Sequence, residues 1–237
     1  MKTGVLTAKE LKSYLGSPAV YISAAVFLIL SGASFVTYLS ALNYSDTSIR
    51  GFIEAAQFLM LLIAAILSMR VITEEKKTGT WELILTSPIT DLEIVIAKFT
   101  AGLAVLSCIL AVSFYFPILL LVFGDPDLGP IVSGYMGLFL LGCAAMAIGI
   151  FASSVTSSQI IAAVLSTGIL FGLWFLGMAG TIIRPPIGNL ISYLSLSDHF
   201  TDFTRGIIDT KHIVYYLSVT GIFLYLSVRS IEMGRWR

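Results

Sequence analysis

Six long apolar stretches, separated by short polar segments, dominate this sequence. A helix needs about 20 apolar residues to cross a bilayer, and a charged residue at the centre of such a span costs about 2.5–3.5 kcal/mol. The middles of these stretches are almost free of charge. The sequence therefore predicts an all-α integral membrane protein with six transmembrane helices. The expected spans are residues 20–42, 52–72, 92–123, 130–151, 159–180 and 212–228.

The composition supports this fold class. Hydrophobic residues make up 57% of the chain and charged residues 12%, about half the charged fraction of ordinary soluble domains. The formal net charge is zero and no basic patch is evident, which argues against a nucleic-acid partner. Cys108 and Cys143 each lie inside an apolar stretch, where we interpret them as small packing residues.

The distribution of lysine and arginine predicts the orientation of the spans, because cytoplasmic loops are enriched in these residues. An inside N-terminus assigns ten of them to the cytoplasmic side and four, Arg50, Arg184, Arg205 and Lys211, to the outer side. Both termini are therefore predicted to be cytoplasmic. The longest outer segment, residues 181–211, mixes apolar and polar residues, which favours short interfacial or re-entrant helices.

The N-terminal segment, residues 5–16, has the pattern of an amphipathic helix. Ala8, Leu11 and Leu15 fall on one face, and Lys9 and Lys12 fall on the other. We expect this helix to lie against the inner leaflet before the first span. The alternative is a solvated leader whose periodicity is accidental.

The segment between the second and third spans, residues 73–90, predicts a helix, a break and a new helix. After "EEKK", which we expect in water, Gly79 permits a turn and Thr80 can cap a short helix over residues 81–85. Pro88 ends that helix. Thr90 and Glu93 then match a capping box at the start of the third span.

A short rigid helix held between two capped spans suits docking of a partner protein. The alternative is a re-entrant hairpin that dips into the inner leaflet for packing alone. The residues "EEKKTGTWELILTSPITDLEIVIAK" and "HFTDFTRGIIDTKHIVYYLSV" resemble the corresponding stretches of ABC-2 type transporter permeases. The opening "MKTGVLTAKELKSYLGSPAVYI" and the "RGIID" segment are most similar to the gliding-motility subgroup.

This resemblance implies that the segment over residues 73–90 is a coupling helix that docks on an ATPase subunit. The residues that it places at this contact are Glu75, Gly79, Thr80, Trp81, Glu82, Leu83, Leu85 and Pro88. Residues 152–158 would form a smaller second contact, although they carry no charged side chain.

No glycine in the chain is followed by lysine, so no P-loop is present. We therefore expect no enzymatic activity and no cofactor on this chain, with ATP and magnesium bound by two separate ABC ATPase subunits. The resemblance further implies export across the bacterial inner membrane. It also implies pairing with a second permease, which is either another copy or a related chain with a large outer domain.

Two pairs of residues within spans are further candidates. Gly168 and Gly172 form a G-x-x-x-G row, which allows close helix packing either within the chain or between two permease copies. Glu54 and Gln57 lie one turn apart near the outer end of the second span. They belong either to a substrate path or to a simply solvated interface.

Two other functions compete with transport. One is a membrane anchor, or a mechanotransmission subunit of an ABC-type complex, which would need the same docking helix. The other is an intramembrane enzyme. Asp198 and His199 resemble half of a catalytic pair, but the motifs of serine hydrolases and zinc proteases are absent. We therefore interpret these two residues as hydrated loop residues. We expect Pro117 to kink the third span.

Overall fold

The computed structural model describes residues 2–41, 48–86, 89–183 and 186–235. Within these ranges the chain forms helices and no strand. The helices are α1 (Lys2–Leu15), α2 (Pro18–Ala41), α3 (Arg50–Ser68), α4 (Thr73–Thr78), α5 (Trp81–Leu85), α6 (Asp91–Ser113), α7 (Tyr115–Phe123), α8 (Leu128–Val155), α9 (Gln159–Ile182), α10 (Ile187–Tyr193), α11 (Leu196–Thr204) and α12 (Thr210–Arg235).

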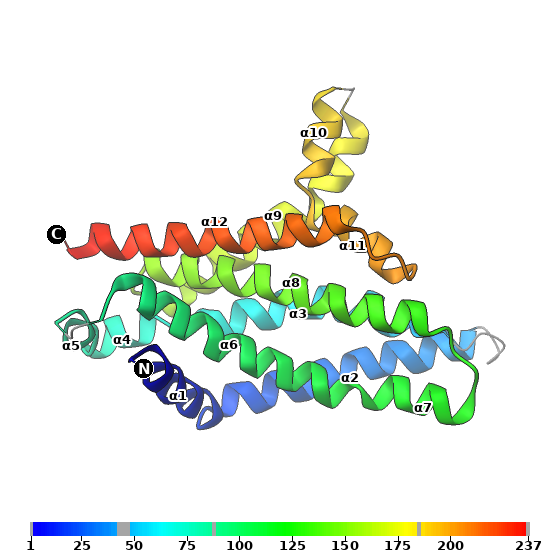
Figure 1. Ribbon diagram of the computed structural model, residues 1–237, viewed down its shortest axis with the longest axis horizontal. Helices are drawn as coiled ribbons and strands as arrows, with labels where there is room; N and C mark the ends of the chain where they lie inside the picture. Colours follow the sequence, from blue (N-terminus) through cyan, green and yellow to red (C-terminus); the bar gives the residue numbers. More distant parts are fainter. Residues whose placement is uncertain (1, 42–47, 87–88, 184–185, 236–237) are drawn as a thin grey trace.

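Six helical segments of the described chain are long and apolar enough to cross a membrane, and they begin with α2, α3, α6, α8, α9 and α12. The all-α membrane fold is therefore confirmed. Figure 1 shows both chain termini at the same end of the bundle as α4 and α5. We call this the proximal end. The opposite end, which carries α7 and α11, is the distal end.

Helix α8 forms the centre of the bundle. In its most apolar stretch, 83% of the residues are buried. In the corresponding stretches of α2 and α9, the buried share is 28% and 22%. It packs against α3, α6, α9 and α12 (Figure 1). The outer faces of α2 and α9 therefore remain for lipid or for another chain, while α8 is enclosed by protein.

A small residue allows α3 to approach α8 closely. A Cβ atom added at Gly149 of α8 would lie 1.7 Å from Oγ of Ser68 in α3. Ala145 and Ser153 continue this small-residue face of α8, and both are buried. Packing within the chain thus accounts for the small residues of α8.

The third span is interrupted at Phe114, between α6 and α7. Pro117 has no backbone N–H, so it cannot bond the carbonyl of Ser113 four residues earlier. The hydroxyl of Tyr135 in α8 donates to that carbonyl at 2.9 Å. The expected kink is present, and a side chain from another span supplies its missing hydrogen bond.

Helix α1 packs on α6 through Leu6 and Glu10, which are buried, whereas Ala8 and Leu15 are exposed. The contact of α1 with α6 includes a carboxylate, which the apolar pattern of the sequence did not predict. The expected face of Ala8, Leu11 and Leu15 against the inner leaflet stays a prediction. The two short helices α10 and α11 occupy the long segment before α12, and α10 projects sideways from the bundle (Figure 1).

Candidate functional site

The segment after α3 contains two short helices joined by a tight turn. Helix α4 ends at Gly79, which adopts a φ of 75°, a left-handed conformation that favours glycine. The hydroxyls of Thr78 and Thr80 lie 2.9 Å apart, and that of Thr80 lies 3.5 Å from the Glu75 carbonyl. Helix α5 begins immediately after this turn, so the predicted helix boundary at Thr80 is present.

Helix α5 has an anchored face and an exposed face. The Trp81 ring is partly buried against a small cluster formed by Leu6 of α1 and by Ile94 and Ala97 of α6. Leu83 is 71% exposed, and Glu82 is also exposed. Trp81 therefore fixes the helix to the bundle, and its neighbours point away from it.

Two of the predicted docking residues are only partly described or not described at all. Leu85 belongs to α5, but its side chain lies outside the described part of the chain, and Pro88 lies outside the described residues altogether.

The capping box at the start of α6 is confirmed. The Thr90 hydroxyl accepts from Glu93 N at 3.3 Å, and the Glu93 carboxylate accepts from Thr90 N at 2.9 Å.

A fully buried lysine connects α4 to two other helices. The Lys98 ammonium of α6 lies 2.7 Å from Glu75 Oε2 and 3.2 Å from Glu10 Oε1. It also donates to the Val71 carbonyl at 2.7 Å. Because a buried charge is tolerated only with paired partners, these contacts hold α1, α4 and α6 together.

The expectation that "EEKK" lies entirely in water was wrong. Glu75 keeps only 14% of its side-chain exposure and also pairs with Lys9 at 3.6 Å. The Lys76 ammonium donates to the Ser154 carbonyl at the end of α8. The physical reason is that one face of α4 packs against the bundle, where Lys98 provides a charge for Glu75. Glu75 is therefore an internal link in this chain.

The last turn of α8 supports the start of α4. The Ser153 hydroxyl accepts from the backbone N–H groups of Ile72 and Thr73, at 3.0 and 3.2 Å. These are amides that the first turn of a helix leaves without internal partners. The segment 152–158 thus contacts α4 directly.

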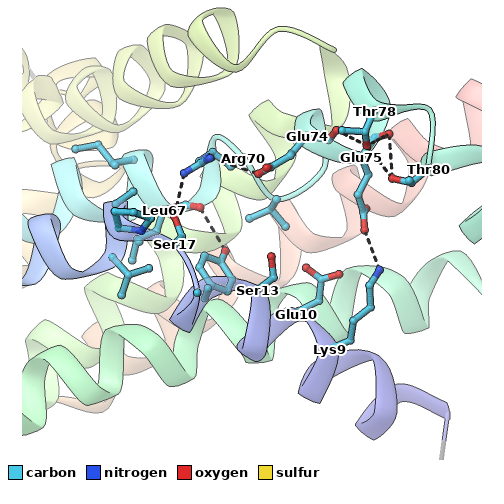
Figure 2. A pocket seen from close by; sticks show the side chains of 17 residues that line it. Lys9, Glu10, Ser13, Ser17, Leu67, Arg70, Glu74, Glu75, Thr78 and Thr80 are labelled. Carbon is cyan, nitrogen blue, oxygen red and sulfur yellow. Dashed lines mark hydrogen bonds and ion pairs between the residues drawn. The ribbon is translucent and has the colours of Figure 1, made fainter.

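A cavity of about 550 Å³ lies between α1, the start of α2, the end of α3 and α4 (Figure 2). On one side Arg70 reaches both Ser17, by a 3.0 Å hydrogen bond, and Glu74, at 3.4 Å. On the other side Glu75 extends towards Lys9, as Figure 2 shows. Charged side chains of both signs thus line a space next to α4.

Tyr14 closes one wall of this cavity. Its hydroxyl donates to the Leu67 carbonyl at 3.3 Å. Burial, and then the negative charge of Glu10, raises the pKa of Tyr14 above its usual range. The side chain therefore stays neutral and serves as a hydrogen-bond donor between α1 and α3.

Comparison with known protein families shows the family to which this chain belongs. The family model described as ABC-2 family transporter protein matches residues 15–229. This chain belongs to the ABC-2 transporter family. No curated protein matches its sequence.

Membership gives this ABC-2 protein its general role. It is a multi-pass membrane protein and the membrane permease component of an ABC transporter, a class of machine that includes a partner ATPase. The match begins at residue 15, within α1, and ends at residue 229, within α12. It therefore covers all six candidate spans almost completely.

The remaining predicted residues of this ABC-2 permease lie outside α4 and α5. A Cβ added at Gly168 or Gly172 would meet no heavy atom of another helix within 4 Å among the described residues. Neither glycine is therefore in close contact with another helix in the described part of the chain. Glu54 is exposed on α3 and Gln57 is partly buried, and the lining of the proximal cavity includes neither residue.

Glu10 and the buried position of Lys98 were not predicted from the sequence. A signal was available, because an ionisable residue near a span is a functional candidate by default. Lys98 stands eight residues into a helix that is otherwise apolar after its first turn. What the sequence does not reveal is the partner, since Glu10 and Glu75 lie on two other helices.

Proposed function

We propose that this permease is the membrane path of an ATP-driven exporter and that α5 receives motion from a separate ATPase subunit. The observation that carries the proposal is the division of α5 into two faces. Trp81 is anchored against α1 and α6, while Glu82 and Leu83 are exposed. A helix that is fixed at its base and free on its outer face suits contact with a second protein.

The contacts of α4 supply a route for the motion into the bundle. A displacement of α5 moves α4 through the short turn at Gly79. Helix α4 is joined to α6 and α1 through Lys98 and to α8 through Ser153. Since α8 is the central helix, a push at the proximal end reaches the core of the bundle directly.

The proposed assembly has two permease copies and two ATPase subunits. The proximal end faces the cytoplasm of a bacterium, as the lysine and arginine distribution favours. ATP and magnesium bind the ATPase subunits, and this chain catalyses no reaction. The unfilled surface at Gly168 and Gly172 supports a close contact between α9 and the second copy, because small residues allow helix backbones to approach.

Two leucine variants test the docking role of α5. Leu83 of α5 and Leu128 at the start of α8 are both exposed, at 71% and 58%, but they lie at opposite ends of the bundle. We expect Leu83→Asp to reduce co-purification of the partner ATPase at least tenfold, whereas Leu128→Asp leaves it unchanged. Both variants should insert in the membrane and elute as the native protein does. Equal ATPase recovery with Leu83→Asp would refute docking through α5.

A further inference from the structure

Three side chains form a continuous chain of hydrogen bonds at the distal end. Nδ1 of His199 lies 2.7 Å from Nδ1 of His212, and Nε2 of His212 lies 2.7 Å from Oδ2 of Asp202. Nε2 of His199 lies 2.9 Å from the carbonyl oxygen of Tyr193. This chain of hydrogen bonds joins the end of α10 to α11 and to the start of α12.

Both imidazole rings are buried, at 4% exposure each. The interpretation of His199 as a hydrated loop residue was therefore wrong. Tyr215 of α12 stacks on the His199 ring, with centroids 3.8 Å apart, and Tyr193 meets the same ring at a near-perpendicular angle. Protein groups surround His199, so its two nitrogen atoms depend on their contacts with His212 and with the Tyr193 carbonyl.

Counting protons shows which charge state these contacts require. The Tyr193 carbonyl can only accept, so His199 must carry a proton on Nε2. One proton must also lie between the two Nδ1 atoms, and one between His212 and Asp202. Three protons are needed, but two neutral imidazoles and one carboxylate have only two. The geometry therefore requires one additional proton.

The additional proton is best placed on His212. An imidazole is a stronger base than a carboxylate, and a protonated imidazole donates from both ring nitrogens, whereas a carboxylate only accepts. His212 then donates from Nε2 to Asp202 and from Nδ1 to His199, and the three groups together carry no net charge. Burial, more than any other cause, lowers the pKa of His199 below its usual range, which agrees with His199 as the neutral acceptor.

Two carboxylates and one ammonium lie beside this hydrogen-bond chain in the contacts of the described residues. Asp198 of α11 and Lys211 of α12 act on His199 electrostatically. Lys211 is 3.9 Å from Asp202 and 3.1 Å from Asp209 in the connection. Helices α8, α9 and α3 also pack on α11. Ser133 of α8 and the Trp174 carbonyl of α9 bond to α11 as uncharged groups, and the charged side chains at the start of α3 are Arg50 and Glu54.

We propose that Asp202, His212 and His199 form a proton-binding site that holds one proton and thereby fixes α10 and α11 to α12. Loss of that proton places two bare Nδ1 atoms face to face at 2.7 Å. Gain of a second proton places two N–H groups face to face. Either change removes the central hydrogen bond, so the packing of the distal helices depends on the occupancy of this site.

The two histidines of the chain are His199 and His212, so ¹⁵N-histidine labelling reports on this site alone when a tag without histidine is used. We expect nitrogen NMR of the protein in lipid at pH 7 to show three protonated ring nitrogens, both of those of His212 and Nε2 of His199. Two protonated nitrogens in the native protein, in any tautomer, would overturn the proposal.

Two conservative variants separate proton binding from a structural role. In Asp202→Asn the amide can donate to His212 Nε2 without a charge, so we expect the number of protonated ring nitrogens to fall from three to two. Asp209→Asn removes a neighbouring carboxylate that contacts Lys211 and should leave the number at three. A count of three in Asp202→Asn, or two in Asp209→Asn, would contradict the assignment of Asp202 as the counter-ion.

Discussion

The Nζ atom of Lys98 lies 2.7 Å from Oε2 of Glu75, at a position where the Lys98 side chain has no solvent exposure. Glu10 completes the cluster from α1. An isolated buried charge is very unfavourable, whereas a paired one is tolerated. The cluster therefore makes the position of α4 depend on α1 and α6.

Replacing Lys98 by methionine should destabilise the protein strongly. The variant leaves Glu10 and Glu75 buried without their cation, and breaking a buried pair in this way typically costs about 3–5 kcal/mol. Thermal unfolding in detergent, followed by tryptophan fluorescence, measures the effect. Lys77→Met, at an exposed position on α4, is the matched control and should change the midpoint little.

The same cluster predicts a rescue. In Lys98→Met combined with Glu10→Gln and Glu75→Gln, no buried charge is left unpaired, so much of the lost stability should return. A triple variant no more stable than Lys98→Met would show that the lysine contributes through its shape rather than its charge.

Tyr135→Phe should cost about 1 kcal/mol of stability or somewhat more, because a buried carbonyl loses its donor. The carbonyl is that of Ser113, which Pro117 leaves without a helical partner. In a Pro117→Ala background the backbone N–H of residue 117 can bond that carbonyl. Tyr135→Phe should then cost less, and a double-mutant cycle by chemical unfolding measures the difference. Equal costs in both backgrounds would mean that the two features are independent.

Two glycine-to-alanine variants should change the stability of the protein in opposite directions. At Gly149 the new Cβ would overlap Ser68, and overpacking of this kind costs about 1–3 kcal/mol. At Gly168 the surroundings within the chain are open, and alanine favours helix over glycine by up to about 1 kcal/mol. Unfolding midpoints in detergent distinguish the two. If Gly168→Ala lowers stability only in the assembled transporter, α9 contacts a second chain at that residue.

Stability should fall as the pH decreases through about 6.5, the reference pKa of histidine. The pKa of His199 in the folded protein lies below its usual range, mainly because the ring is buried. The unfolded chain therefore binds more protons than the folded one below that pH, and linkage favours unfolding. Unfolding midpoints from pH 6.5 to pH 5 test this. His199→Gln should show a smaller decrease over the same range, and an identical decrease would place the effect elsewhere.

The elements that depend on neighbouring residues were predictable from the sequence. The six spans follow from apolar length, the turn at Gly79 from a residue that tolerates positive φ, and the start of α6 from the reciprocal bonds of Thr90 and Glu93. The kink at Pro117 follows from its missing N–H. Each of these features is set within a few residues along the chain, so local chemistry is sufficient.

Contacts between distant segments were decided only by the tertiary structure. Lys98 meets carboxylates that are 88 and 23 positions away in the sequence, and Ser153 caps a helix that begins 80 positions earlier. Whether a small-residue row packs inside the chain, as at Gly149, or faces outward, as at Gly168, depends on which helices are neighbours. A single sequence specifies the face of a helix but not what lies opposite, because that is determined by the packing of the whole bundle.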